Sequence, residues 1–177
     1  LSRVLARSRN LGPFPIPLAL FITAEVLKAL QFAHQRTDEN GRFLNIVHCD
    51  ISPQNILISF AGEVKLTDFG ISKAAFQMEE QQQVIRGKYA YMSPEQARGR
   101  RVDQTTDLFS LSIVIYETAT GELPFKGDSP LDTMHAIAFD EIPAVTEIRT
   151  NLPPDLHRIV SRCLRKQPTD RYPDAKT

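Results

Sequence analysis

The sequence predicts a mainly α-helical domain with one small β-hairpin. Apolar residues between Leu18 and Ala33 recur at the spacing of one helical face, so this stretch is expected to form a long amphipathic helix. Leu108–Ala119 is apolar around most of a helical circumference, which is typical of a helix buried on all sides. Two short strand-like runs, Ile56–Ser59 and Glu63–Thr67, are separated by Phe60-Ala61-Gly62 and predict the hairpin.

Breaker residues place the elements before the hairpin. A short basic helix is expected at the start of the chain, because Gly12 and the prolines at positions 13, 15 and 17 interrupt it. The long amphipathic helix is expected to run to about His34. The polar stretch Thr37–Asn45 contains an Asn-Gly pair, which predicts a turn or a short hairpin.

Similar signals place the elements in the C-terminal half. Gly121 and Pro124 are the punctuation expected at the end of the buried helix. Apolar periodicity then predicts further helices at Leu131–Phe139 and Asp155–Leu164. With 177 residues, 42% of them hydrophobic, the chain is long enough for one domain around one core.

The composition argues against several classes of partner. Lys plus Arg and Asp plus Glu number 21 each, so no global field attracts nucleic acid or an acidic membrane surface. We find no run of about 18 apolar residues and expect no membrane contact from this segment. The two cysteines, Cys49 and Cys163, fit neither a disulfide framework nor a metal site, which favours a cytoplasmic location. The parent protein could still be anchored through a segment outside this one.

One acid and amide set carries the chemistry. His48-Cys49-Asp50-Ile51-Ser52-Pro53-Gln54-Asn55 is followed, after the hairpin, by Asp68-Phe69-Gly70. An Asp, an Asn five residues later and a second Asp before Gly are the groups that position a hydroxyl and hold Mg²⁺ on the phosphates of a nucleotide. Taken alone, these acids could also merely cap turns around a hairpin.

This set resembles the catalytic centre of the protein kinase family. Further landmarks of that family follow in order: Ser93-Pro94-Glu95, Asp107 in the buried apolar run, and Asp170-Arg171. Pro53-Gln54 and Gln96 resemble the bacterial serine/threonine members. The resemblance implies a protein-kinase-like C-terminal lobe that uses ATP and Mg²⁺ and acts on a protein substrate.

The resemblance also implies a role for each motif residue. Asp50 would accept the proton of the substrate hydroxyl, while Asn55 and Asp68 would hold Mg²⁺ and thereby ATP. His48 would pack on Phe69, beside Gly70, as a structural residue.

Three further residues are expected to be structural. Asp107 is either a helix N-cap or, as the resemblance implies, the acceptor of backbone N–H groups from the catalytic loop. Glu95 and Arg171 are either surface charges or, by the resemblance, a buried ion pair.

Three positions depart from the family pattern. Cys49 stands where most such kinases have an Arg that binds a phosphate on the activation loop, and no Ser, Thr or Tyr occurs between Lys73 and Lys88. Ser52 stands where a Lys usually steadies the transferring phosphate, and Lys88 where a Thr is usual. Either these two residues have exchanged roles in catalysis, or both functions have been lost independently.

Residues 1–177 are therefore expected to be a partial protein kinase domain, cut at both ends, because the N-lobe with its Gly-rich loop and strand Lys should precede Leu1. The isolated chain should be inactive without that lobe. Two alternatives stay open. The departures at Ser52 and Cys49 favour a pseudokinase or scaffolding module. A small-molecule kinase of the aminoglycoside phosphotransferase type shares the loop of Asp50 and Asn55, but not normally the Phe-Gly pair or the later landmarks.

Overall fold

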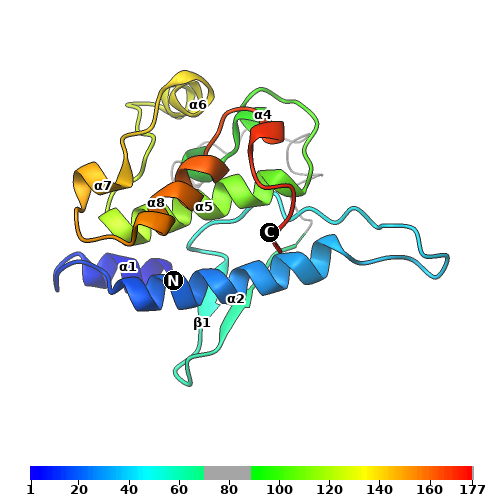
Figure 1. The fold of residues 1–177 in the computed structure, drawn as a ribbon, viewed down its shortest axis with the longest axis horizontal. Coiled ribbons are helices and arrows are strands. Elements are labelled where there is room, and N and C mark those ends of the chain that lie inside the picture. The colour runs from blue at the N-terminus through cyan, green and yellow to red at the C-terminus, as the bar shows by residue number, and fades with distance from the viewer. Residues whose placement is uncertain (70–88, 177) are drawn as a thin grey trace.

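A buried central helix, α5 (Gln104–Thr120), organises the residues that the computed structural model describes, 1–69 and 89–176 (Figure 1). The helix begins at Asp103, whose carboxylate accepts a hydrogen bond from the Thr105 amide, and it ends at Gly121, which adopts φ 80°. All residues from Thr105 to Ala119 are buried. Four elements pack against this helix: α2 (Ile16–His34), η1 (Tyr89–Tyr91), α7 (Val145–Ile148) and α8 (Pro154–Cys163).

Helix α2 is the predicted amphipathic helix, and it also has the length and apolarity that a membrane-spanning helix needs. An 18-residue stretch of α2 has a mean hydropathy of 1.6, and 33% of that stretch is buried inside the protein. We expected no such segment, so that expectation is wrong for length and composition. Val26 and Leu30, exposed by only 1% and 0%, lie in the core that α2 and α5 share. Packing inside the protein accounts for the apolarity of the buried face of this helix, whereas Phe21 and Phe32 on its other side are 49% and 67% exposed.

The predicted hairpin consists of β1 (Ile56–Ile58) and β2 (Val64–Leu66), paired antiparallel with Ile56 opposite Leu66. Gly62 turns the chain between them at φ 85°. Strand β2 packs against α2. As a result the hairpin is fixed to the core, and the residues just before β1 and just after β2 lie side by side.

The remaining helices are short. Helix α1 (Ser2–Ser8) is the predicted basic helix, and α6 (Pro130–Phe139) and α8 match the two helices predicted for the C-terminal half. The polar stretch Thr37–Asn45 forms a turn with one bridge between Thr37 and Phe43. Helices α4 (Pro94–Ala97) and α7 and the turn η2 (Pro168–Asp170) were not predicted. Each is too short to show a helical period in the sequence.

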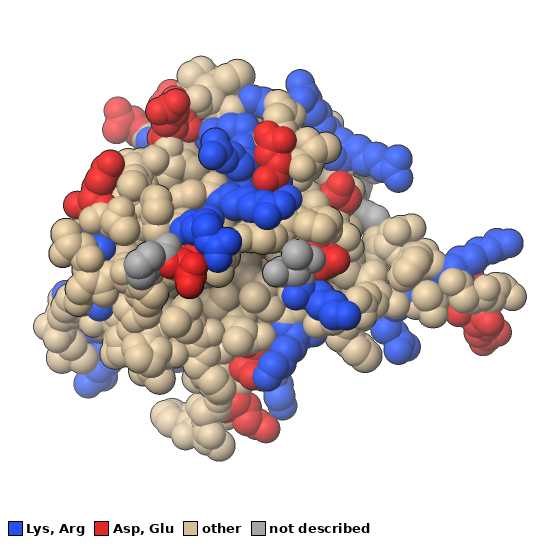
Figure 2. Space-filling model, viewed as in Figure 1, with Lys and Arg blue, Asp and Glu red and all other residues tan. Residues whose placement is uncertain are grey.

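The prediction of a mainly α-helical fold with a small hairpin is confirmed for the described residues. On the face shown in Figure 2, acidic and basic side chains are interspersed among neutral ones. This mixture fits the equal numbers of acidic and basic residues in the sequence.

Candidate active site

The loop before β1 presents Asp50, and two neighbours fix its backbone. The Asp50 amide donates to His48 Nδ1 at 3.2 Å, and its carbonyl accepts a hydrogen bond from Asn55 Nδ2 at 2.7 Å. The loop also turns back on itself, because the backbone N–H of Asn55 donates to the Ser52 carbonyl at 3.1 Å. Asp50 is therefore held on a tight, internally bonded loop and remains partly exposed.

Asn55 links its side chain directly to the Asp50 carboxylate. Besides its bond to the Asp50 carbonyl, Asn55 Nδ2 lies 3.0 Å from Asp50 Oδ2. An amide nitrogen has two N–H donors, and both are used here. The Asn55 oxygen, which accepts only, is thereby turned to a different direction and is the atom suited to a cation.

Asp68 follows β2 and is exposed. The hairpin brings it beside Asn55, since the Thr67 amide donates to the Asn55 carbonyl at 3.0 Å. Asp68 adopts φ 64°, a left-handed conformation that costs a non-glycine residue roughly 1–2 kcal/mol. Such a conformation persists only where the surrounding structure holds it. It turns the chain sharply at the point where the carboxylate is presented.

Asn55 and Asp68 provide oxygen donors that suit Mg²⁺. The described residues contain no cluster of three or more His, Cys, Asp or Glu side chains that could hold a metal by themselves. Mg²⁺ does not require such a cluster, because it commonly binds one or two protein oxygens and completes its shell with water and substrate phosphates. One carboxylate and one oriented amide oxygen therefore fit this cation.

His48 is fully buried and joins the loop to the hairpin. Its Nε2 lies 2.7 Å from the Thr67 carbonyl, which can only accept, and its Nδ1 accepts from the Asp50 amide. These partners place Nε2 beside an acceptor and Nδ1 beside a donor. The ring centroid lies 4.6 Å from that of Phe69. The structure thus surrounds His48 with packing and backbone contacts.

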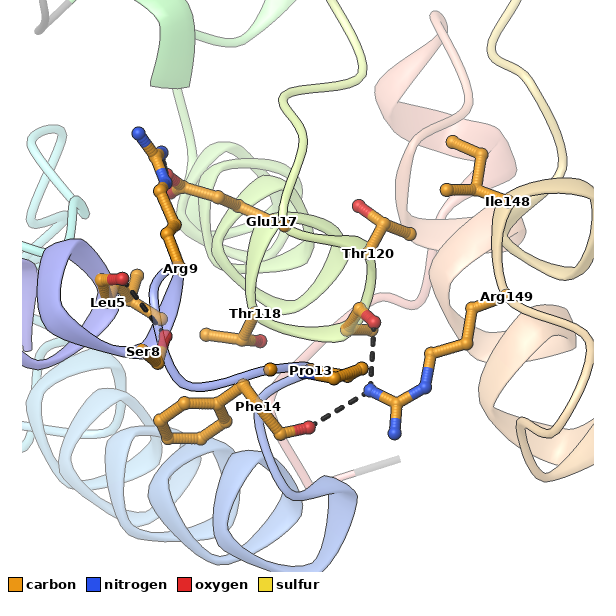
Figure 3. A pocket seen from close by; sticks show the side chains of 13 residues that line it. Leu5, Ser8, Arg9, Pro13, Phe14, Glu117, Thr118, Thr120, Ile148 and Arg149 are labelled. Carbon is orange, nitrogen blue, oxygen red and sulfur yellow. Dashed lines mark hydrogen bonds and ion pairs between the residues drawn. The ribbon is translucent and has the colours of Figure 1, made fainter.

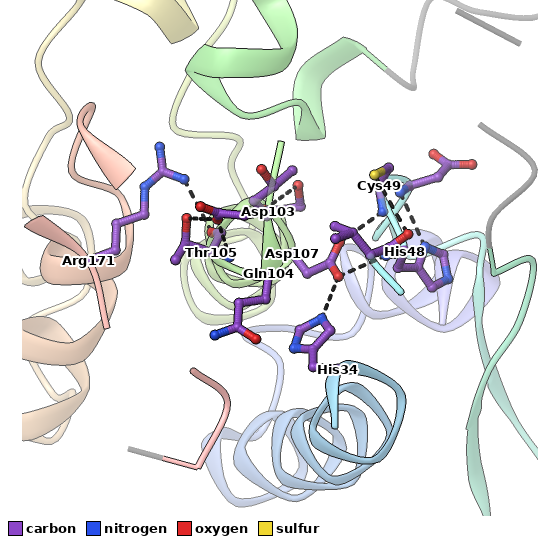
Figure 4. A network of polar contacts seen from close by, with 12 residues as sticks. His34, His48, Cys49, Asp103, Gln104, Thr105, Asp107 and Arg171 are labelled. Atoms are coloured by element: carbon purple, nitrogen blue, oxygen red, sulfur yellow. Dashed lines mark hydrogen bonds and ion pairs between the residues drawn. The ribbon is translucent and has the colours of Figure 1, made fainter. Parts of the chain in front are cut away.

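Asp107 anchors the same loop from the central helix (Figure 4). Its Oδ2 accepts from the His48 amide at 2.9 Å and its Oδ1 accepts from the Cys49 amide at 2.8 Å. The interpretation of Asp107 as an N-cap is wrong, because the N-cap of α5 is Asp103, one turn earlier. Asp107 is instead the buried acceptor of loop N–H groups that the resemblance implied.

His34 is a third partner of Asp107 that the sequence did not reveal. Its Nε2 lies 2.8 Å from Asp107 Oδ2, and the two side chains are 3% and 0% exposed. His34 ends α2, four residues after the fully buried Leu30. A polar residue at that position on the apolar face was the available signal, since buried polar side chains are normally hydrogen-bonded.

Glu95 and Arg171 lie together in the interior. Arg171 Nη1 and Nη2 are each 2.8 Å from one Glu95 oxygen, and the Thr106 hydroxyl donates to Glu95 Oε1 at 2.6 Å. Burial by itself would raise the pKa of Glu95. The hydrogen bonds from Arg171 and Thr106 and the charge of Arg171 outweigh burial, so the pKa lies below its ordinary value.

Gln96 is a second residue whose contact with the site the sequence did not reveal. Its Nε2 donates to the Cys49 carbonyl at 2.8 Å, and its Oε1 accepts from the Ser93 amide at 2.9 Å. With the Ser93 side chain it forms the capping box of α4. A Ser followed by Gln at the third helical position is the sequence signature of such a box.

Ser52 is fully buried, and its hydroxyl has no hydrogen-bond partner among the described residues. Its proposed exchange partner Lys88, together with Gly70 and the segment between Lys73 and Lys88, lies outside the described residues. The exchange of roles between Ser52 and Lys88 therefore stays a prediction.

Two cavities among the described residues are lined by side chains outside this loop. One, of about 400 Å³, is bordered by α1 and the end of α5 (Figure 3). Beside it Glu117 accepts from Arg9 at 3.1 Å and from the Tyr91 hydroxyl at 2.6 Å, and burial, reinforced by Glu117, raises the pKa of Tyr91. Asp50, Asn55 and Asp68 do not line this cavity.

A second cavity, of about 550 Å³, lies between the end of α6 and α8. Burial lowers the pKa of Lys166, one of its lining residues, to about 8, and Lys166 Nζ donates to the Ile137 carbonyl at 2.7 Å near the end of α6. The three candidate residues do not line this cavity either.

Comparison with known proteins assigns a family to this arrangement. The profile of the family described as Protein kinase domain matches residues 2–176. The tyrosine-protein kinase MasK of Myxococcus xanthus is 40% identical over 175 residues, which cover 98% of this chain and 27% of that protein.

Two other bacterial relatives are named as serine/threonine-protein kinases. The serine/threonine-protein kinase PknB of Mycobacterium leprae is 40% identical over 167 residues, covering 93% of this chain and 25% of PknB. The probable serine/threonine-protein kinase CPE1738 of Clostridium perfringens is 38% identical over 166 residues, covering 93% of this chain and 23% of the relative. The chain thus spans about a quarter of the length of these relatives.

Proposed function

Because this chain belongs to the protein kinase family, we propose that it is the catalytic lobe of a serine/threonine protein kinase. Joined to an N-lobe, it transfers the γ-phosphate of ATP to a Ser or Thr hydroxyl of a protein. The observation that carries this proposal is the double hydrogen bond from the Asn55 amide to the backbone and the carboxylate of Asp50. It holds the Asp50 carboxylate beside the side-chain amide of Asn55, and the bond from the Thr67 backbone N–H to the Asn55 carbonyl ties the residue before Asp68 to the same loop.

In this function Asp50 accepts the proton of the substrate hydroxyl and orients that hydroxyl for attack. Asn55 and Asp68 hold Mg²⁺, which when bound neutralises charge on the phosphates. Asp107 and His48 keep the loop in place through the His48 and Cys49 amides and the Thr67 carbonyl. Phosphoryl transfer depends mainly on such positioning, because the transferred group is reactive by itself.

The choice of Ser and Thr over Tyr is supported by the similarity to the serine/threonine-protein kinases PknB and CPE1738. It is opposed by the similarity to the tyrosine-protein kinase MasK. The test is phosphoamino-acid analysis after transfer from labelled ATP to a peptide library that contains all three acceptors. Phosphoserine and phosphothreonine are expected. Predominant phosphotyrosine would overturn the specificity but leave the kinase proposal intact.

The kinase proposal itself is tested with a protein in which an N-lobe precedes Leu1, with the 177-residue chain alone as the comparison. The longer protein should transfer phosphate. The chain alone should not, and calorimetric titration with Mg-ATP should show no micromolar binding, because the proposed function assigns half of the nucleotide cleft to the N-lobe. Absence of transfer by the longer protein at any substrate concentration would contradict the proposal.

A pseudokinase or scaffold is the second candidate. The buried hydroxyl of Ser52, which has no partner in the described part of the chain, favours it, since Ser52 stands where the family resemblance places a phosphate-steadying Lys. The bonded set of Asp50 and Asn55 favours the active enzyme. Phosphotransfer by the longer protein distinguishes the two.

A further inference from the structure

The residue before Asp50 is held in an unusual backbone conformation from two sides. Cys49 adopts φ 65°, which non-glycine residues seldom do. Its N–H donates to Asp107 Oδ1 at 2.8 Å, from α5. Its carbonyl accepts from Gln96 Nε2 at 2.8 Å, from α4. Two separate helices therefore hold this one residue.

The peptide between Cys49 and Asp50 is bonded at both of its polar atoms. Gln96 holds the carbonyl oxygen, and His48 Nδ1 accepts from the N–H at 3.2 Å. The plane of this peptide sets the direction in which the Asp50 side chain leaves the backbone, because a peptide unit is rigid.

The amide of Gln96 is itself fixed. The side chain is buried, its Oε1 accepts from the Ser93 amide at 2.9 Å, and its backbone N–H donates to Ser93 Oγ at 3.3 Å. With the oxygen occupied by the helix cap, only the nitrogen can face Cys49. The backbone N–H of Ser93, rather than its side chain, thus orients the donor that reaches the Cys49 carbonyl.

We propose that Gln96 is a positioning residue for Asp50, acting through the Cys49 carbonyl. This inference rests on the proposed kinase function. In this role Gln96 links the position of α4 to the direction in which the Asp50 carboxylate points. A left-handed non-glycine residue relaxes when its restraints are removed, and a small displacement of a catalytic group lowers the rate of a reaction that depends on positioning.

The test uses Gln96→Glu in the protein that carries an N-lobe. Glutamate keeps the shape of the side chain and still accepts from the Ser93 amide, as Glu and Gln both do in capping boxes. It has no donor for the Cys49 carbonyl. We expect kcat to fall roughly tenfold or more, with KM for ATP unchanged, because Asn55 and Asp68 are untouched.

The pH profile separates loss of the donor from general damage. When the introduced glutamate is protonated, its carboxyl group regains an O–H donor, and burial next to a carbonyl favours the protonated form. The kcat of Gln96→Glu relative to the unchanged protein should therefore rise between about pH 8 and about pH 6. Gln96→Met, similar in length and without a donor, should lose kcat equally and show no such recovery.

Ser93→Ala is the matched control, because it removes the other half of the cap and leaves the bond from Gln96 to Cys49. It should lower the melting temperature but keep kcat within about twofold, given the usual modest cost of a lost cap. Unchanged kcat in Gln96→Glu and Gln96→Met, or an equal loss in Ser93→Ala, would overturn the proposal.

Hydrogen exchange gives a readout that does not depend on activity. Exchange of the Asp50 amide should quicken in Gln96→Met and stay unchanged in Ser93→Ala. If the unchanged protein transfers no phosphate, the kinase proposal fails while this measurement still decides the positioning role. Equal exchange in all variants would refute that role.

Discussion

Arg171 and Glu95, 76 residues apart in the chain, form a buried ion pair in which each Glu95 oxygen lies 2.8 Å from one guanidinium nitrogen. The other Arg171 donors reach the carbonyls of Arg165, Thr105 and Lys166, so all five N–H groups of the guanidinium are used. The guanidinium also lies over the Phe109 ring, with its central carbon 4.8 Å from the ring centroid. This pair ties α4 to α5 and to the C-terminal segment.

Arg171→Met should lower the free energy of unfolding by about 3–5 kcal/mol, because it leaves the Glu95 carboxylate buried without its cation. Urea denaturation measures the change. Arg158→Met is the matched control, since Arg158 pairs with Asp155 at the surface, where the side chains are 71% and 81% exposed. Exposed pairs contribute little to stability. Equal losses in the two variants would contradict the structural importance of the buried pair.

The pH dependence of stability should reveal the lowered pKa of Glu95. The folded-state pKa lies below the ordinary value of 4.5, so the stabilisation by ionised Glu95 is fully present above pH 4.5 and is lost as the pH falls through the folded-state pKa. The difference in unfolding free energy between the unchanged protein and Glu95→Gln should thus be constant from about pH 5 to about pH 8 and shrink below pH 4.5. A difference that grows on acidification would show the opposite shift.

Asp50→Asn and Asp68→Asn should each abolish most of the turnover of the protein that carries an N-lobe. Loss of a general base typically costs about 10²- to 10⁴-fold, and loss of Asp68 removes a Mg²⁺ ligand. Both side chains are at least partly exposed, so the melting temperature should hardly change. Asp155→Asn, which alters an exposed acid on α8, should keep full activity. Near-normal phosphorylation by either of the first two variants would refute the assigned roles.

The exchange of roles between Ser52 and Lys88 predicts coupled mutational effects. Lys88→Thr alone should remove about 2–4 kcal/mol of transition-state stabilisation, the usual scale for one preorganised electrostatic partner. Ser52→Lys alone should place a second ammonium group close to that of Lys88. The double variant should recover activity beyond the sum of the single effects. Because Ser52 is 0% exposed, unfolding must be measured alongside the rate. Additive effects would favour the pseudokinase.

Leu57 should contribute to nucleotide binding. It is the middle residue of β1, which begins directly after Asn55. Leu57 is 52% exposed next to the fully buried Ile56, so it offers an apolar surface beside the proposed Mg²⁺ ligand. In the protein that carries an N-lobe, Leu57→Asp should raise the dissociation constant for Mg-ATP about tenfold or more, as expected when an apolar contact of about 1.5–3 kcal/mol is lost. Phe60→Asp at the exposed hairpin tip is the control. Equal affinity in both variants would exclude the role of Leu57.

Local sequence patterns determined the main elements of the fold. The helical periodicity that ends near His34, the apolar run before Gly121 and the two short runs around Gly62 each became the expected element. These patterns suffice because a helix or a hairpin must bury one face, and the spacing of apolar residues indicates which face that is. The order of Asp50, Asn55 and Asp68 likewise suggested the chemistry.

The tertiary structure alone decided how that chemistry is held in place. Asp107 could have been a cap, but the fold places its carboxylate against the His48 and Cys49 amides, with His34 as a further partner. Gln96 reaches Cys49 only because α4 packs beside the loop. Such contacts join residues distant in the chain, and the hydrogen-bonding capacity of a side chain does not specify its partner. Burial does, since it removes water and leaves each polar atom only the neighbours that the fold supplies.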